Sequence, residues 1–126
     1  MAIEENLYQH IVDNIATVGG RVYPQNYDQP VTLPCITYRK VSGPRLRVMG
    51  GRGGLTWPRF QVVSWAMHYR EAKELAEEVR LLLDGIDDEM DGEPCDVSLM
   101  NEYDLYDTDA RWYGVGMDFE IWHQET

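Results

Sequence analysis

The chain has 126 residues, 44% of them hydrophobic, and its 11 basic against 22 acidic side chains give a net charge of −11 at pH 7. This length predicts one domain, residues 1–126, whose core needs neither disulfides nor metal. The charge argues against a protein that binds nucleic acid through phosphate contacts. The lack of a long apolar run or a basic leader excludes a membrane-spanning segment and a secretory signal, so we expect a soluble protein made in the cytoplasm.

The charges divide sharply along the sequence. Residues 1–70 carry eight basic and four acidic side chains, whereas residues 71–126 carry three basic and eighteen acidic ones. No acid occurs from residue 30 to 70, and no base from residue 84 to 109. Two interpretations are open. The two sets form opposite solvated faces of one molecule, or a basic and an acidic patch join copies of the chain head to tail into a ring.

Two segments have the spacing of amphipathic helices. Apolar residues recur at intervals of three and four over residues 3–18, and the pair Gly19-Gly20 ends the pattern. The same period is clearer over residues 72–86, where acids occupy the other side and Gly85 is the natural terminator. Both patterns are typical of helices that pack one apolar stripe on a core.

Four segments have the composition or alternation of strands. Residues 113–122 alternate between apolar and small or polar side chains, which predicts one buried and one wet face. Residues 34–41 and 59–67 are rich in β-branched and aromatic side chains and predict central strands. Residues 96–106 predict a weaker strand, with four apolar or aromatic side chains on one alternation: Val97, Leu99, Tyr103 and Leu105.

The remaining segments complete the predicted order of elements. A short Val22-Tyr23 segment follows the first helix, residues 24–34 form a loop, and the glycine-rich residues 43–57 predict a loop or flexible hairpin. The order predicts an α+β fold. We expect an antiparallel sheet of about four strands, two helices packed on one face, and a protruding glycine-rich hairpin.

No motif in the sequence supports catalysis. The three histidines lack the spacing of a zinc site, and the glycines of residues 50–54 lack the Lys-Ser/Thr of a phosphate-binding loop. Cys35 and Cys95 are expected to be free, buried thiols. The acidic cluster consists of Asp87, Asp88, Glu89, Asp91 and Glu93. It lacks the spacing of a calcium-binding loop and predicts either a solvated turn or a surface for a basic partner. We therefore expect that the protein is not an enzyme and has no catalytic residue, cofactor or metal site.

Several fragments resemble one family and occur in that family's order. A helix ending in a glycine pair is followed by Gly20-Arg21-Val22-Tyr23-Pro24 and then by Leu33-Pro34-Cys35-Ile36-Thr37-Tyr38. A glycine-bearing hairpin leads into Arg59-Phe60-Gln61-Val62, and the second helix precedes Glu102-Tyr103-Asp104-Leu105-Tyr106 and Asp118-Phe119-Glu120-Ile121-Trp122. Together these fragments resemble the small tail-completion or tail-terminator proteins, including head-to-tail joining proteins, of long-tailed bacteriophages.

The resemblance implies a structural virion protein that caps the head-proximal end of the tail tube and joins the tail to the head at the neck. It also implies a homo-oligomeric ring, expected to be a hexamer, with the tail tube protein and a head-closure or connector protein as partners. DNA passes through such a ring without being specifically bound, and acidic subunits would repel it. We expect the protein in the virion and, during assembly, in the host cytoplasm, with no membrane partner.

The segment from residue 43 to 59 is the candidate contact with another subunit or with the tail tube, because it is long, glycine-rich and free of acids. The acidic cluster is the candidate patch that meets a partner or lines the passage for DNA. The candidate interface residues are Arg45, Arg47, Arg52 and Arg59.

Two other functions remain open. An acidic binding module that mimics DNA and inhibits a basic enzyme would explain the excess of carboxylates, but it has no use for the seven bases between residues 39 and 70. A small metal-dependent enzyme using the acidic cluster would be stabilised against unfolding by calcium or magnesium.

Overall fold

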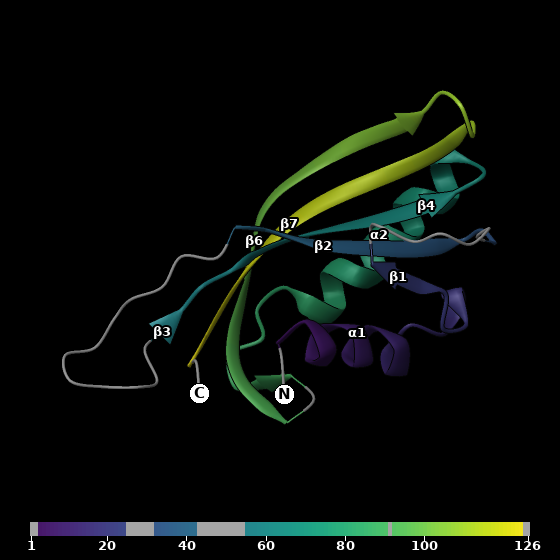
Figure 1. The fold of residues 1–126 in the computed structure, drawn as a ribbon. Coiled ribbons are helices and arrows are strands. Elements are labelled where there is room, and N and C mark those ends of the chain that lie inside the picture. Colours follow the sequence, from purple (N-terminus) through teal and green to yellow (C-terminus); the bar gives the residue numbers. More distant parts are fainter. Residues whose placement is uncertain (1–2, 25–31, 43–54, 91, 125–126) are drawn as a thin grey trace.

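The computed structural model describes residues 3–24, 32–42, 55–90 and 92–124. In this part of the chain six strands follow the order β1-β2-β4-β7-β6-β5, and a seventh, β3, pairs with β7. Both helices lie on one face of the sheet (Figure 1). The helices are α1 (Ile3–Asn14) and α2 (Tyr69–Leu83); the strands are β1 (Val22–Pro24), β2 (Cys35–Ser42), β3 (Leu55–Thr56), β4 (Arg59–Ala66), β5 (Glu89–Met90), β6 (Glu93–Asp107) and β7 (Trp112–Gln124).

The predicted α+β class with two helices on one face is confirmed, but the sheet differs from the prediction. The described residues form seven strands rather than about four, and β1 runs parallel to β2, with Val22 beside Ile36. A three-residue strand is too short to show a period-two pattern, so the sequence does not predict that β1 pairs with β2. Most of the predicted hairpin, residues 43–54, lies outside the described residues, and β3 follows it.

The first predicted helix is divided into two parts. α1 ends at Asn14, Ile15 adopts an extended conformation, and a 3-10 turn at Ala16–Val18 follows. Gly19 ends this turn in the left-handed region and donates its N–H to the Ala16 carbonyl at 3.0 Å, which is the conformation that glycine adopts without strain. The predicted apolar stripe is confirmed, since each member is at most 5% exposed: Ile3, Leu7, Ile11, Ile15 and Val18.

The second helix agrees closely with the prediction. α2 ends at Leu83, and Gly85 follows with a positive φ of 88°. Its solvent side carries acids, so the helix is strongly amphipathic. No helix in the described part of the chain is long and apolar enough to span a membrane. The residues that α2 buries against the sheet are Ala72, Leu75, Ala76, Val79 and Leu83.

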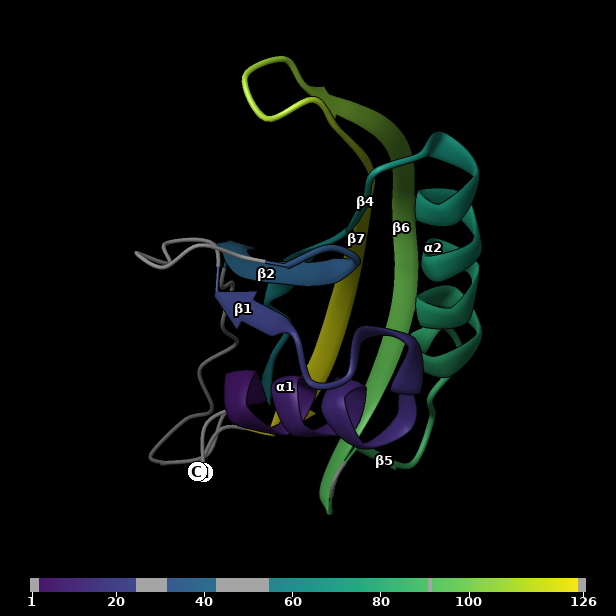
Figure 2. The same ribbon diagram turned by 90° about the vertical axis from the view of Figure 1, so that its right-hand side faces the viewer.

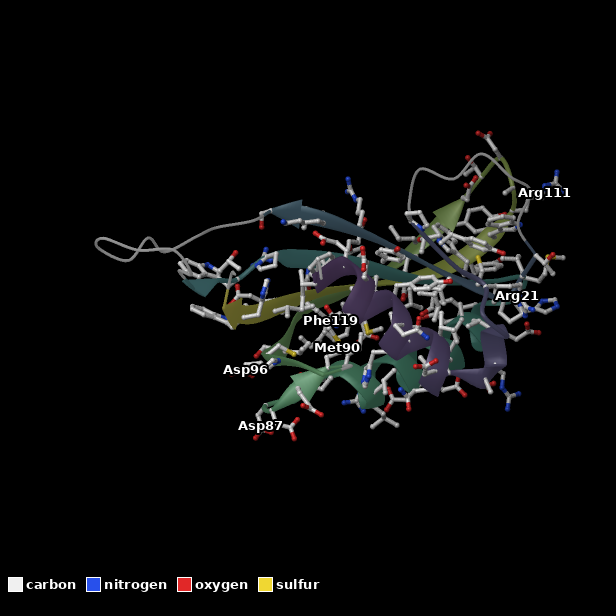
Figure 3. All side chains as sticks on the ribbon, turned by 60° about the horizontal axis from the view of Figure 1, so that its bottom comes forward. Arg21, Asp87, Met90, Asp96, Arg111 and Phe119 are labelled. Carbon is white, nitrogen blue, oxygen red and sulfur yellow. The ribbon has the colours of Figure 1, made fainter. Side chains whose placement is uncertain are left out.

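The last strand carries the centre of the core. The prediction that alternate side chains of β7 are buried is confirmed, except that Tyr113, at the start of the strand, is 37% exposed. Phe119 of β7 and Met90 of β5 belong to the same buried cluster as the helix stripes (Figure 3). The four fully buried side chains of β7 are Val115, Met117, Phe119 and Ile121.

β6 corrects the sequence prediction most strongly. It is one of the two long strands, and its pairing with β7 slips by one residue between Leu99 and Asn101. Such a bulge reverses the alternation beyond it. Val97 and Leu99 therefore face the helices, whereas Tyr103 and Leu105 face the other side, so the prediction that all four share one face is wrong. Figure 1 shows β6 curling from the hairpin tip down to β5.

Both cysteines are buried, and neither forms a disulfide with the other. Burial raises the pKa of the Cys35 thiol to about 11, although the positive charge of Arg21 acts in the opposite direction. The thiol therefore stays protonated at neutral pH and is a poor nucleophile.

We predict that Phe119→Ala lowers the free energy of unfolding by about 3–5 kcal/mol, because it removes a fully buried ring from the centre of β7 and leaves a cavity. Urea unfolding followed by circular dichroism measures the change. Leu81→Ala is the control, because Leu81 is 68% exposed and should change stability by less than about 0.5 kcal/mol. Equal losses in the two variants would contradict this view of the core.

Candidate functional site: the helix-free face of the sheet

The face of the sheet opposite the helices carries all four tryptophans of the chain. Trp65 of β4 shares the alternation of Arg59 and Gln61, and Trp122 of β7 shares that of Asp118 and Glu120. Each tryptophan is half-buried rather than buried, and none belongs to the core cluster. The tryptophans form two pairs: Trp57 stacks on Trp122 at 4.6 Å between ring centroids, and Trp65 meets Trp112 edge-on at 6.2 Å.

Two glycines of β7 form the floor of this face. A Cβ added at Gly116 would lie 2.3 Å from Cε2 of Tyr103, and one added at Gly114 would lie 2.8 Å from the Trp65 ring. The rings of Tyr103 and Trp65 therefore lie directly on the β7 backbone. Only glycine permits this close approach. In the first half of β7, the face that was predicted to be exposed to solvent is therefore covered by these aromatic rings.

A chain of hydrogen bonds crosses the face from β2 to β7. The Arg39 guanidinium donates to Gln61 Oε1 at 2.8 Å, the Gln61 amide donates to the Tyr103 hydroxyl at 2.5 Å, and that hydroxyl donates to Asp118 Oδ1 at 3.0 Å. Burial raises the pKa of the Tyr103 hydroxyl. The hydrogen bond with Gln61 lowers this pKa, and the hydrogen bond with Asp118 raises it. The phenol therefore remains a donor at neutral pH and fixes the ring over Gly116.

A shallow depression lies on this face between β2 and the end of the β6–β7 hairpin. Trp65 closes one side by donating its indole N–H to Thr37 Oγ1 at 3.1 Å. Aromatic rings with a polar atom at the edge are characteristic of surfaces that bind other proteins. The described residues contain no cluster of His, Cys, Asp and Glu that could hold a metal ion. The lining residues are Thr37, Tyr38, Arg39, Gln61, Val63, Trp65, Leu105, Asp107 and Trp112.

The structure describes only one of the four candidate basic residues. Arg59 begins β4 on the helix-free face, is half-buried, and lies opposite Glu120 of β7. Glu120 also accepts the indole N–H of Trp122 at 2.6 Å, so Arg59 borders the second tryptophan pair. Arg45, Arg47 and Arg52 lie outside the described residues.

The described candidate acids lie between the end of α2 and the start of β6, at the edge of the sheet. Asp87, Asp88 and Glu89 are exposed, and the Asp88 carboxylate accepts the Glu89 N–H at 2.6 Å, as expected of a solvated turn. Asp91 lies outside the described residues, and Glu93 begins β6. The strands β7 and β6 separate these acids from Arg59, so the structure does not bring Arg59 and the described acids together. Figure 3 shows Asp87 and Arg111 at opposite ends of the molecule.

The tryptophans of the helix-free face were not predicted as a site from the sequence, although the sequence contains a signal for them. Trp65 and Trp122 fall on the alternations that also carry charged and polar residues, rather than on the apolar ones. Large aromatic side chains on the wet alternation of a strand indicate an interaction surface.

The family model described as tail completion protein gp17 matches residues 6–124. A chain of a solved structure, the virion of a native gene transfer agent (GTA) particle, is similar with a TM-score of 0.73 and 16% sequence identity, and the match covers 98% of this chain and 95% of that chain. At this identity the likeness shows a shared fold. The comparison with curated proteins gives no match.

We predict that Gly116→Ala destabilises the protein by about 1–3 kcal/mol, because the added methyl group displaces the Tyr103 ring from a packed position. Chemical denaturation measures the loss. In a Tyr103→Ala background the same substitution should cost much less, and the difference is the coupling between the two positions. Additive losses in the double variant would show that the ring and the glycine are not in contact.

Proposed function

Because this chain belongs to the family of tail completion protein gp17, we propose that it caps the head-proximal end of a phage tail tube and joins the tail to the head. The observation that carries the proposal is the family match over residues 6–124. Membership of this family implies a structural part of a virion without a catalytic role. The fold shared with a chain of a GTA virion supports the same assignment.

The protein acts as a ring of identical copies, six in number. The division of charge along the chain supports head-to-tail contact, since unlike patches on one subunit attract the neighbouring copies. Arg45, Arg47, Arg52 and Arg59 contact the next subunit or the tail tube protein. The helix-free face, with its half-buried tryptophans, offers a second surface for the tube or for a head-closure protein, because tryptophan is enriched where interfaces are strongest.

The genome passes through the ring without being bound. The acid-rich half of the chain, with the cluster at residues 87–93 and the exposed acids of α2, repels the phosphate backbone along the passage. If these acids faced outward in the assembled ring, this part of the proposal would be wrong.

The placement of the acids favours this function over a DNA mimic. A mimic needs its carboxylates on one continuous face. In the described residues Glu78 is exposed on α2, Asp118 lies on the helix-free face, and Asp87 and Asp109 lie at opposite ends of β6 and its flanking turns. The described acids are therefore spread over more than one side of the molecule.

We predict a particle of about six times 14.6 kDa when the purified protein is measured by light scattering after gel filtration at low salt. High salt should reduce the mass, because it screens contacts between charged surfaces. A monomer at both salt concentrations that also fails to bind isolated tails would contradict the proposal. A monomer that binds tails would place ring assembly on the tube.

We predict that Arg45→Ala/Arg47→Ala/Arg52→Ala leaves folding intact and impairs incorporation into virions, because the three charges belong to the proposed contact. Complementation of a phage that lacks the protein measures incorporation. The control is Arg70→Ala/Lys73→Ala/Arg80→Ala, which removes the same charge from the solvent side of α2, where the ion pairs are exposed and contribute little to stability. Normal incorporation of the first variant would refute the contact.

A further inference from the structure

The depression on the helix-free face contains an aromatic corner that the surrounding structure holds in place. Trp65 and Trp112 meet edge-on there, with 6.2 Å between the ring centroids and 61° between the ring planes. Trp65 is fixed from two sides, because its indole N–H donates to Thr37 Oγ1 at 3.1 Å and its ring lies on the backbone of Gly114. Rings that are already ordered lose little conformational entropy when a ligand binds. The corner is therefore a preformed platform for an apolar group.

The side-chain acceptors around this corner are already engaged. Thr37 Oγ1 accepts the indole N–H described above, and Gln61 Oε1 accepts a hydrogen bond from Arg39 at 2.8 Å. Asp107 is the acid that lines the depression, and its Oδ1 accepts two backbone N–H groups of the hairpin turn, each at 3.0 Å. A ligand that must donate hydrogen bonds therefore finds few acceptors here.

The groups that remain available at the depression are donors. Arg39 is exposed and uses its Nε toward Gln61, while its two terminal nitrogens form no hydrogen bond or ion pair with a described residue. The indole N–H of Trp112 likewise meets no acceptor within the part of the chain that the structure describes. Guanidinium and indole groups donate hydrogen bonds and accept none. The depression thus offers aromatic surface together with hydrogen-bond donors.

A proline-rich segment in the polyproline II conformation has the complementary chemistry. Proline has no backbone N–H to donate, and a polyproline II helix makes no internal hydrogen bonds, so its carbonyls are open to donors. Such segments dock in aromatic-lined grooves because they are extended before they bind. Other extended chains would bring N–H groups to a face that has few acceptors. An α-helix satisfies its own carbonyls and would leave the two donors unused.

We propose that this depression binds a proline-rich segment of another virion protein, with proline rings against Trp65 and Trp112. The Trp112 indole and the Arg39 guanidinium donate to carbonyls of that segment. The volume of the depression is about 350 Å³, near the lower end of the range of about 300–1,000 Å³ for ligand sites in proteins, which suits a few residues of extended chain. The inference rests on the role of the helix-free face in the proposed function, and it names the chemistry of the partner.

A peptide titration followed by fluorine NMR tests the site in the 126-residue chain. Fluorotryptophan labelling gives one signal for each of the four tryptophans, and variants with one tryptophan replaced by phenylalanine assign them. The probe is an acetylated peptide of about eight prolines, added up to about 1 mM. We expect the signals of Trp65 and Trp112 to shift and those of Trp57 and Trp122 to stay. Shifts confined to the second pair, or no shift at all, would overturn the inference.

A glycine-serine peptide of the same length is the control ligand. It carries an N–H group at every residue and has no rings, so we expect no binding at the concentrations where the proline peptide binds. Equal binding of the two peptides would show that the depression does not select proline, and it would overturn the inference.

Substitutions at Trp112 separate the donor from the ring. Trp112→Phe keeps an aromatic ring and removes the indole N–H, so it should weaken binding of the proline peptide about two- to tenfold. Trp112→Ala also removes the ring and should weaken binding further. Trp57→Phe is the matched control, because it alters the other tryptophan pair of the same face, and it should bind as the wild type does. Unchanged binding by either Trp112 variant, with folding confirmed by circular dichroism, would overturn the inference.

Complementation of a phage that lacks the protein separates this inference from the proposed function. Wild-type protein that enters virions but binds no proline peptide would overturn the inference alone. Wild-type protein that binds the peptide but never enters virions would overturn the proposed function. Entry into virions that is lost in Trp112→Ala and kept in Trp57→Phe would support both.

Discussion

The pairing of β6 with β7, interrupted once at the bulge between Leu99 and Asn101, is the constraint on which both faces of the sheet depend. Before the bulge along the chain, β6 directs Val97 and Leu99 into the core. After the bulge the alternation of side chains is reversed, which places Tyr103 on the helix-free face and Asp104 beside α2. A β6 without the bulge would exchange the faces of Tyr103 and of the exposed Glu102 and Asp104, so the ring would no longer lie on Gly116 and Asp104 would no longer reach Lys73.

The parts of the fold that the sequence predicts are those with local causes. The stripe of α2 and the alternation of β7 need only their own residues to specify a buried side, and both agree with the structure. The bulge in β6 has no such signature, because residues 97, 99, 103 and 105 share one parity in the sequence and only pairing with β7 shows that they do not share a face. The parallel pairing of β1 is likewise set by a partner more than ten residues away.

The helix-free face shows how much of the site was predictable. Trp65 and Trp122 alternate with core residues, so the sequence places them outside the core. It does not show that Gly114 and Gly116 receive aromatic rings, because the contact between Tyr103 and Gly116 crosses two strands whose register depends on the bulge. Most of the candidate basic segment lies outside the described residues, and its role rests on charge and composition.

The bulge also bears on the shape of the sheet. β6 supplies much of the visible curl (Figure 2), and a bulge increases local bending and twist. The extra residue between Leu99 and Asn101 therefore has two effects: it gives Tyr103 and Asp104 their faces, and it bends the strand away from the plane of its first half.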